Sequence, residues 1–278
     1  MVLIKSFQMN IHYFVQLILI GLLFSACKKD ISNHEVLPIV GGVNILAIVE
    51  DKSSSSTNRI LVDASKDGGV WWFPQGASGY NIEAYHQGQK LADYLRSQGF
   101  AVDELSIGAK VTTEVLSRYN KIIRACAIRG YTNDEIAAYD GFLNRGSSLL
   151  LFQDHLKNFP NDLLSKHLGI EFAGAGGTSV TVLSQHAITT GVTSIPYMVG
   201  SAIVNNDKSK MTILGTLGPN DYVDMNKNNM KDAGDVIAAP VMGILHHPKS
   251  KIFFMGDVNS VEQVPQPFTS NLVKWLFQ

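Results

Sequence analysis

The sequence predicts an α/β fold: a doubly wound, mostly parallel, flavodoxin-like sheet with an antiparallel β extension in the C-terminal half. Through residues 43–154, short apolar runs alternate with amphipathic helices, and the runs are mostly continuous, as in strands covered on both faces. After residue 155, several runs show β-branched alternation instead, which favours antiparallel strands. These two patterns together define the fold class.

The clearest unit spans residues 121–154. Strands over 121–128 and 147–154 flank a helix over 132–144, whose start is marked by a capping box of Thr132 and Glu135. Gly146 then ends the helix. A right-handed crossover puts the tip of the second strand at the carboxyl edge of the sheet, where such folds bind ligands.

The other elements follow in chain order. Before this unit the pattern predicts strands over 43–50, 59–63 and 101–105, and helices over 81–98 and 111–119. After it come a helix over 161–168, a glycine-rich loop over 171–177, strands over 178–183, 211–217, 240–245 and 251–256, and a helix over 268–277. No internal repeat or second linker interrupts this series, so residues 43–278 are predicted to form a single domain.

The N-terminus has the pattern of a signal peptide. Lys5 precedes the apolar segment 13–24, and the small residues Ser25 and Ala26 lead into Cys27. This resembles a bacterial lipoprotein signal over 1–26, with Cys27 as the lipidated residue and 27–42 as a tether. The expected location is therefore the bacterial cell envelope, outside the cytoplasm, with the membrane as partner. An uncleaved anchor helix or an ordinary cleavage site are the alternatives.

The net charge and the second cysteine bear on which partners and chemistry to expect. The formal net charge is −1, and no basic run carries interleaved aromatics, so nucleic acid is not an expected partner. The second cysteine, Cys126, lies inside an apolar strand and is expected to be a buried small hydrophobe rather than a nucleophile.

Four pieces of the chain resemble the class I glutamine amidotransferase-like superfamily, in its non-amidotransferase branches of ThuA-like proteins and related bacterial lipoprotein domains. They are the strand 59–63 with the stretch 86–102, the strand–helix–strand unit ending at Asp154, the string 186–192 (HAITTGV), and the final strand with helix, 251–276. The resemblance implies the fold described above. It also implies a Cys nucleophile after the central strand of active amidotransferases, where this chain has Gln153-Asp154-His155, so glutamine hydrolysis is not expected.

A loop over 63–75 is expected at the same edge of the sheet. Lys66 and Asp67 stand beside Trp71 and Trp72, and aromatic rings next to carboxylates are typical of carbohydrate sites. The alternative is that these rings fill the core at the end of the sheet. His86 and Asp257 complete the candidate ligand-binding residues.

Acid–base chemistry is the second interpretation of this edge. Asp67, Asp154 and His155 are the candidate catalytic residues, because a histidine beside carboxylates suits a general base or a metal ligand. Asp63 is expected at the same edge. Strand-end aspartates also cap the turns and helices that follow them, which is the structural alternative.

Residues 224–235 match the template of a calcium-binding loop. Oxygen-bearing side chains occur at positions 1, 3, 5, 9 and 12, and position 7 offers a carbonyl. Asn229 replaces the usual turn glycine, and asparagine tolerates the left-handed conformation. A structural Ca²⁺ site and a polar hairpin loop are both open. The candidate ligands are Asp224, Asn226, Asn228, Met230, Asp232 and Asp235.

The function expected from these observations is that of a lipid-anchored, extracytoplasmic accessory or ligand-binding protein, related to carbohydrate and without amidotransferase activity. A glycan-directed hydrolase that uses Asp and His at the carboxyl edge is the alternative, and a scaffold without a small ligand is a third.

Overall fold

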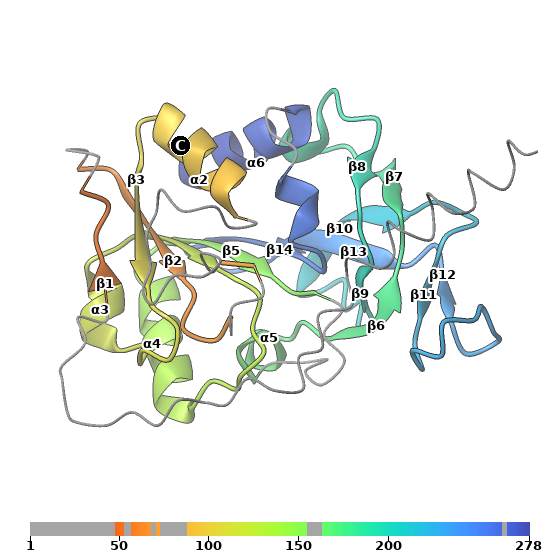
Figure 1. Ribbon diagram of the computed structural model, residues 1–278, viewed down its shortest axis with the longest axis horizontal. Coiled ribbons are helices and arrows are strands. Elements are labelled where there is room, and N and C mark those ends of the chain that lie inside the picture. Colours follow the sequence, from red (N-terminus) through yellow and green to blue (C-terminus); the bar gives the residue numbers. More distant parts are fainter. Residues whose placement is uncertain (1–47, 53–56, 68–70, 73–87, 155–162, 263–265) are drawn as a thin grey trace, which may run out of the picture. The chain divides into compact units, whose positions relative to one another are not determined.

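A computed structural model describes residues 48–52, 57–67, 71–72, 88–154, 163–262 and 266–278 (Figure 1). The chain divides into two compact units, Met1–Asn44 and Ile45–Gln278, and all described residues belong to the second. The predicted signal peptide and tether lie outside the described residues. No helix in these ranges is both long and apolar enough to span a membrane.

Half of the larger sheet is parallel. Its strands lie in the order β3, β2, β4, β5, β14, with all four pairings parallel, and the short β1 adds antiparallel to β3 at the edge. The bounds are β1 Ile48–Val49, β2 Arg59–Asp63, β3 Ala101–Leu105, β4 Lys121–Arg124, β5 Ser148–Phe152 and β14 Lys251–Met255.

The same sheet continues through antiparallel strands beyond β14, as the C-terminal sequence predicts. These are β13 (Pro240–Leu245), β10 (Met211–Leu217), β7 (Ser179–Leu183) and β8 (Ile195–Pro196). The large sheet is therefore mixed, and the molecule is an α/β protein.

Helices cover both faces of the parallel part (Figure 1). Leu91 and Leu95 of α2 and Leu272 of α6 share one apolar core with Ile123 and Phe253 of the strands. The opposite core contains apolar side chains of α3, α4 and α5. The bounds are α2 Gln89–Ser97, α3 Thr113–Ser117, α4 Asn133–Leu143, α5 Leu163–His167 and α6 Pro267–Phe277; η2 (Ala187–Thr189) and η3 (Asn259–Val261) are single 3₁₀ turns.

A second sheet of four antiparallel strands lies beside the first, in the order β12, β11, β6, β9. Its strands are β6 Phe172–Gly176, β9 Gly200–Ile203, β11 Tyr222–Asp224 and β12 Val236–Ile237. The prediction of a glycine-rich loop over 171–177 is wrong, because β6 occupies that stretch. A Cβ on Gly176 would lie 2.5 Å from the carbonyl oxygen of Tyr222, so glycine here permits close strand contact rather than a loop.

The predicted elements agree with the structure best where the signals are local. β2 and β3 have the predicted bounds, and α4 begins after Thr132, whose hydroxyl accepts a hydrogen bond from the Glu135 amide while the Glu135 carboxylate accepts one from the Thr132 amide. β4 is shorter than predicted, because the apolar residues 125–127 that follow Arg124 are buried but lie outside the strand.

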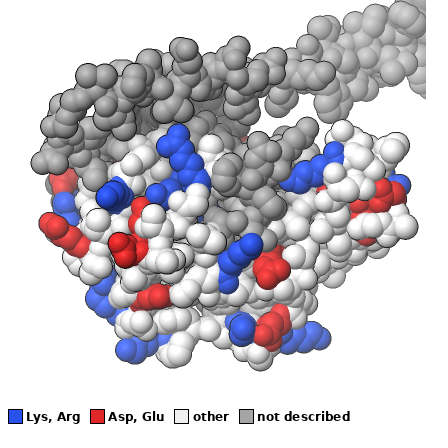
Figure 2. Space-filling view, turned by 90° about the horizontal axis from the view of Figure 1, so that it is seen from below, with Lys and Arg blue, Asp and Glu red and all other residues white. Residues whose placement is uncertain are grey.

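Charges of both signs are interspersed on the face drawn in Figure 2. Lys and Arg side chains alternate there with Asp and Glu, in keeping with the near-neutral sequence. The described part of this face therefore forms no large patch of a single sign that would steer a polyanion.

Candidate functional site at the carboxyl edge

Several parallel strands end in acidic or amide residues at one edge of the sheet. Asp63 is the last residue of β2, Gln153 and Asp154 follow β5, and Asp257 follows β14 after Gly256. All are at most 4% exposed. Ligands of open α/β sheets bind at this edge, so we take it as the candidate functional site.

Asp154 and Asp257 form its charged centre. The Asp257 carboxylate accepts hydrogen bonds from the Asn259 amide (2.9 Å), the Met198 amide (2.8 Å) and the Ser260 hydroxyl (3.0 Å). Burial, together with the negative charge of Asp154, nevertheless raises the pKa of Asp257 to about 7. A carboxyl group with a pKa near neutrality is able to hold or release a proton at the pH of most cells.

The segment between β8 and β9 packs against this pair. The Tyr197 hydroxyl donates to the Ser201 carbonyl (2.6 Å), and the Ser201 hydroxyl donates to the Asp154 carbonyl (2.8 Å). Burial, followed by the charges of Asp257 and Asp154, raises the Tyr197 pKa well above its ordinary value. Tyr197 is therefore a neutral hydrogen-bond donor here and not an acid.

The same segment also reaches the surface. Met198 and Val199 are 58% and 49% exposed, directly beside the buried pair. Val199 has φ 62°, a left-handed conformation that β-branched residues rarely adopt. Backbone strain of this kind concentrates at functional sites, so we define Tyr197–Ser201 as the strained corner of the site.

The loop after β2 turns its aromatics inward. The Asp67 carboxylate accepts hydrogen bonds from the amides of Trp71 (2.9 Å) and Trp72 (3.2 Å), and both indoles are 1% exposed. Trp71 stacks edge-on against Phe152 of β5, with ring centroids 5.2 Å apart. In this conformation the two rings are part of the core, as in the structural alternative, and neither offers a face to a sugar.

Trp72 forms a hydrogen bond with Glu104, a buried acidic residue that the sequence analysis did not select as a candidate. Its indole N–H donates to the Glu104 carboxylate at 2.9 Å, and burial raises the pKa of Glu104 to about 8. Glu104 belongs to β3, where an acidic residue inside an apolar strand is the signal that marks it.

Lys66 and Asp63 serve other partners. The Lys66 ammonium donates to Glu135 at the start of α4 (2.8 Å), so it stabilises the helix cap. One oxygen of Asp63 accepts hydrogen bonds from the hydroxyls of Tyr131 (3.0 Å) and Tyr139 (2.6 Å). The predicted acidic residues therefore fall into two groups. Asp63 lies with Tyr131 and Tyr139, whereas Asp154 and Asp257 lie together with Tyr197.

Cys126 follows β4 and is fully buried, in agreement with its prediction as a core residue. His86 and His155, the two predicted histidines of the site, lie outside the described residues. Their place in the candidate site stays a prediction.

The predicted calcium loop connects β11 to β12, so strands flank it rather than helices. The Asp224 carboxylate accepts hydrogen bonds from the amides of Lys227 (2.5 Å) and Asn229 (2.6 Å), and the two oxygens of Asp235 accept from Met225 and Asp232. Asn229 has φ 63°, a left-handed conformation that asparagine tolerates. Within the described ranges, no three His, Cys, Asp or Glu residues are grouped to hold a metal.

The comparisons with known proteins concern the fold. No protein-family model matches the chain, and no curated protein does. Among solved structures, the N-terminal domain of mmIFT52 matches with a TM-score of 0.55 at 16% identity, covering 79% of this chain and 96% of that domain. A cytoplasmic protein from Salmonella typhimurium LT2 matches with a TM-score of 0.50 at 14% identity, covering 79% of this chain and 100% of its own. This chain shares their fold.

A putative ThuA-like protein from Bacteroides uniformis is also among the matched structures. It is 19% identical, with a TM-score of 0.48, and the match covers 78% of this chain and 90% of that one. At such identities the likeness extends to the fold alone, so the function is argued from the site.

Proposed function

We propose that this protein is an accessory or ligand-binding protein, related to carbohydrate, that lacks amidotransferase activity. One observation supports the lack of amidotransferase activity: Gln153 and Asp154 follow β5 where an amidotransferase has its nucleophile, and Cys126 is fully buried one strand away. The expected result with glutamine is no release of ammonia. Ammonia release that disappears in Cys126→Ser would overturn the proposal.

We assign the fold, in finer terms, to the doubly wound flavodoxin-like sheets of the class I glutamine amidotransferase-like superfamily. The strand order β3, β2, β4, β5, β14 and the helices on both faces support this. Two of the resembling pieces also meet in space: the Asn271 side chain donates to the carbonyls of Ile188 and Thr190, and the Trp275 ring lies 5.4 Å from His186.

The ligand is expected at the strained corner. Met198 and Val199 expose apolar side chains next to the buried Asp154–Asp257 pair, and an apolar surface of this kind suits the C–H face of a sugar. A panel of oligosaccharides in isothermal titration calorimetry is expected to give at least one ligand. Met198→Ser should weaken the binding of that ligand. Met230→Ser, which changes a similarly exposed methionine in the loop between β11 and β12, should leave the binding unchanged. Equal affinity in both variants would place the ligand elsewhere.

A hydrolase is the second candidate, because Asp257 has a pKa of about 7 beside a second carboxyl group. Glycosidases use such pairs, in which one group holds a proton and the other does not. If this activity exists, Asp154→Asn and Asp257→Asn are expected to abolish glycan turnover while leaving binding measurable. A glycan that binds but is never cleaved by the unaltered protein excludes the hydrolase.

We propose the bacterial cell envelope, outside the cytoplasm, as the location, with a lipid on Cys27 as the link to the membrane. The lipobox sequence ending at Cys27 supports this. Metabolic labelling with radioactive palmitate is expected to label the protein, and the labelled protein is expected in the membrane fraction of the cells. Label that persists in Cys27→Ser would contradict the assignment, because a different residue would then carry the lipid.

We further propose a structural calcium ion in the loop 224–235. Six residues place oxygen donors at the template positions, and Asn229 adopts the turn conformation that the template requires. Calcium is expected to raise the melting temperature, by preferential binding to the folded state, and Asp232→Asn is expected to reduce the shift. Asp207→Asn, which alters an exposed turn elsewhere, is the control. A melting temperature unchanged by calcium or chelator would leave the loop a polar hairpin.

A further inference from the structure

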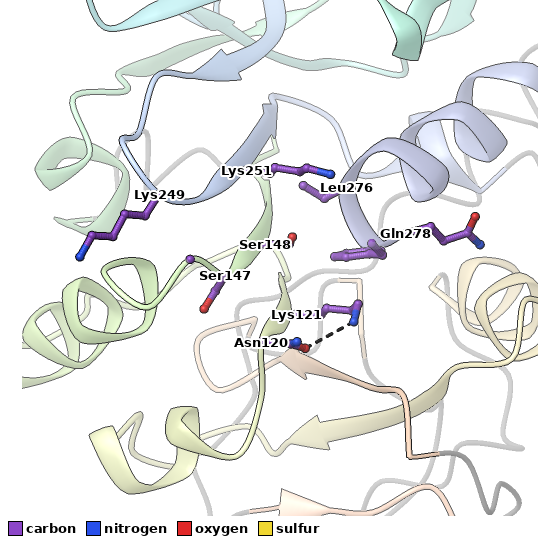
Figure 3. Close-up of a pocket in the computed structure, with 10 residues that line it drawn as sticks. Asn120, Lys121, Ser147, Ser148, Lys249, Lys251, Leu276 and Gln278 are labelled. Carbon is purple, nitrogen blue, oxygen red and sulfur yellow. Dashed lines mark hydrogen bonds between the residues drawn. The ribbon is translucent and has the colours of Figure 1, made fainter.

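A pocket of about 270 Å³ lies at the opposite, amino edge of the parallel sheet. It is bounded by the starts of β4, β5 and β14 and by the end of α6 (Figure 3). The candidate site lies at the other edge of the sheet and does not involve these residues. Its lining contains three lysines, at positions 121, 249 and 251, and no Asp or Glu side chain.

Two of these lysines flank a serine in one row. Lys121 and Lys251 both align with Ser148 in the sheet register, on either side of β5. Neighbouring strands lie about 4.8 Å apart, so the two lysine Cα atoms are about 10 Å apart. The three side chains project to the α6 face, since the residues two places further along each strand belong to the α6 core. Figure 3 shows the Ser148 hydroxyl between them.

The two ammonium groups have only neutral partners among the described residues. Lys121 donates to the side-chain oxygens of Asn58 (2.9 Å) and Asn120 (3.4 Å), and Lys251 donates to the Trp275 carbonyl (2.8 Å). Burial lowers the pKa of Lys121, because no carboxylate offsets its loss of hydration. In the described ranges the Ser148 hydroxyl makes no hydrogen bond.

We propose that this pocket binds a small oxyanion, such as the phosphate, sulfate or carboxylate group of a soluble ligand. Lys121 and Lys251 donate charged hydrogen bonds to it and the Ser148 hydroxyl donates a neutral one. Lys249 also lines the pocket, but its side chain extends away from Ser148 in Figure 3, so the proposal does not use it. The volume suits an anionic group with a small attached body and is too small for a polymer.

The structural alternative is that the lysines only support the fold. Lys251, at the start of β14, donates a hydrogen bond to the Trp275 carbonyl in the last turn of α6 and so stabilises the end of that helix. Lys121 packs over the Phe100 ring. The two interpretations differ in one respect, because only the first requires a saturable response to an oxyanion.

The experiment titrates the purified protein with inorganic phosphate, sodium acetate and sodium chloride at matched ionic strength and pH 7. Calorimetry measures the affinity for each anion, and a shift of the Ser148 amide NMR signal shows that the anion binds in this pocket. Saturable binding of phosphate or acetate that shifts Ser148 is expected, and the stronger of the two identifies the anionic group. Lys121→Gln should weaken the binding about tenfold or more, since it removes a charged hydrogen bond. Lys208→Gln, an exposed lysine on the β9–β10 loop, should leave it unchanged.

Ser148→Ala is the second variant, since it removes only a hydroxyl and leaves both lysines in place. It is expected to fold with an unchanged melting temperature and to bind the oxyanion several-fold more weakly. An equal response to chloride, or full affinity in Lys121→Gln, would overturn the proposal and leave the lysines as supports of α6.

Discussion

At the scale of single residues, the unusual features of this protein gather around Asp257. A carboxyl group that accepts three hydrogen bonds ordinarily has a low pKa, yet burial and the charge of Asp154 outweigh those donors. The strained Val199 lies in the segment that supplies one of the three donors, Met198. Protonation and backbone strain are thus located in the same few residues.

Asp154→Asn is expected to lower the pKa of Asp257 from about 7 towards its ordinary value, because it removes the neighbouring negative charge. A ¹³C NMR titration of the Asp257 carboxyl carbon measures this, with Asp140→Asn as a distant control. An Asp257 that titrates near 3.8 in the unaltered protein would contradict the prediction.

The same shift has a consequence for stability. Folded Asp257 binds its proton more tightly than the unfolded chain does, so its contribution is present at low pH and is lost as the pH rises from about 4 to about 7. In urea unfolding, Asp154→Asn is therefore expected to flatten the pH dependence over this window. An unaltered slope would mean that the two carboxyl groups do not interact.

Val199→Asn should stabilise the fold by about 1 kcal/mol, because asparagine tolerates the left-handed backbone that costs valine about 1–2 kcal/mol. Urea denaturation measures the change. Val199→Ala is the matched control, since alanine retains the left-handed penalty and is not expected to stabilise. If both variants have the same stability, the corner is not strained.

At the scale of elements, α4 illustrates what local sequence is able to specify. The helix begins after Thr132 because the side chains of Thr132 and Glu135 satisfy each other's backbone amides, and the two residues are only three positions apart in the sequence. Glu135 also binds the Lys66 ammonium and the Val111 amide, which are remote in the chain. No local signal predicts these two additional contacts.

Thr132→Ala is expected to lower the free energy of unfolding by about 1 kcal/mol, because the Glu135 amide loses its acceptor. Thr112→Ala, which removes the cap of the short exposed helix α3, should cost less, since fewer tertiary contacts depend on α3. Chemical denaturation of the two variants side by side is the measurement. A larger loss in Thr112→Ala would reverse this ranking.

At the scale of the whole molecule, a glycine seam joins the two sheets. The Ser201 amide at β9 donates to the Gly256 carbonyl after β14 at 2.8 Å, and this contact places the strained corner over the Asp154–Asp257 pair. A Cβ on Gly256 would overlap the Ser201 carbonyl oxygen, and one on Gly200 would lie 2.7 Å from the Asp257 Cβ. The site therefore exists only because two backbones approach without side chains between them.

Gly256→Ala is expected to destabilise the protein by several kcal/mol, as overpacking against backbone does, and to disturb the Asp257 titration. Gly141→Ala, in the middle of α4 with nothing near its Cβ, should instead stabilise by about 1 kcal/mol. A lower melting temperature for Gly256→Ala and a higher one for Gly141→Ala would confirm the close contact between the two sheets. A neutral Gly256→Ala would show that the sheets have room to separate.

The sequence by itself determined the features that depend on neighbours in the chain. The alternation of apolar runs and helices, the Thr132 cap and the buried Cys126 are all local signals with local causes. The tertiary structure decided the rest: β6 forms a strand because Gly176 permits close pairing, Trp71 and Trp72 turn into the core, and Tyr197 meets Asp257 across 60 residues of chain. Periodicity shows which residues of an element are buried, but it does not show which distant residues they contact. Long-range contacts of this kind are therefore not predictable from the sequence pattern.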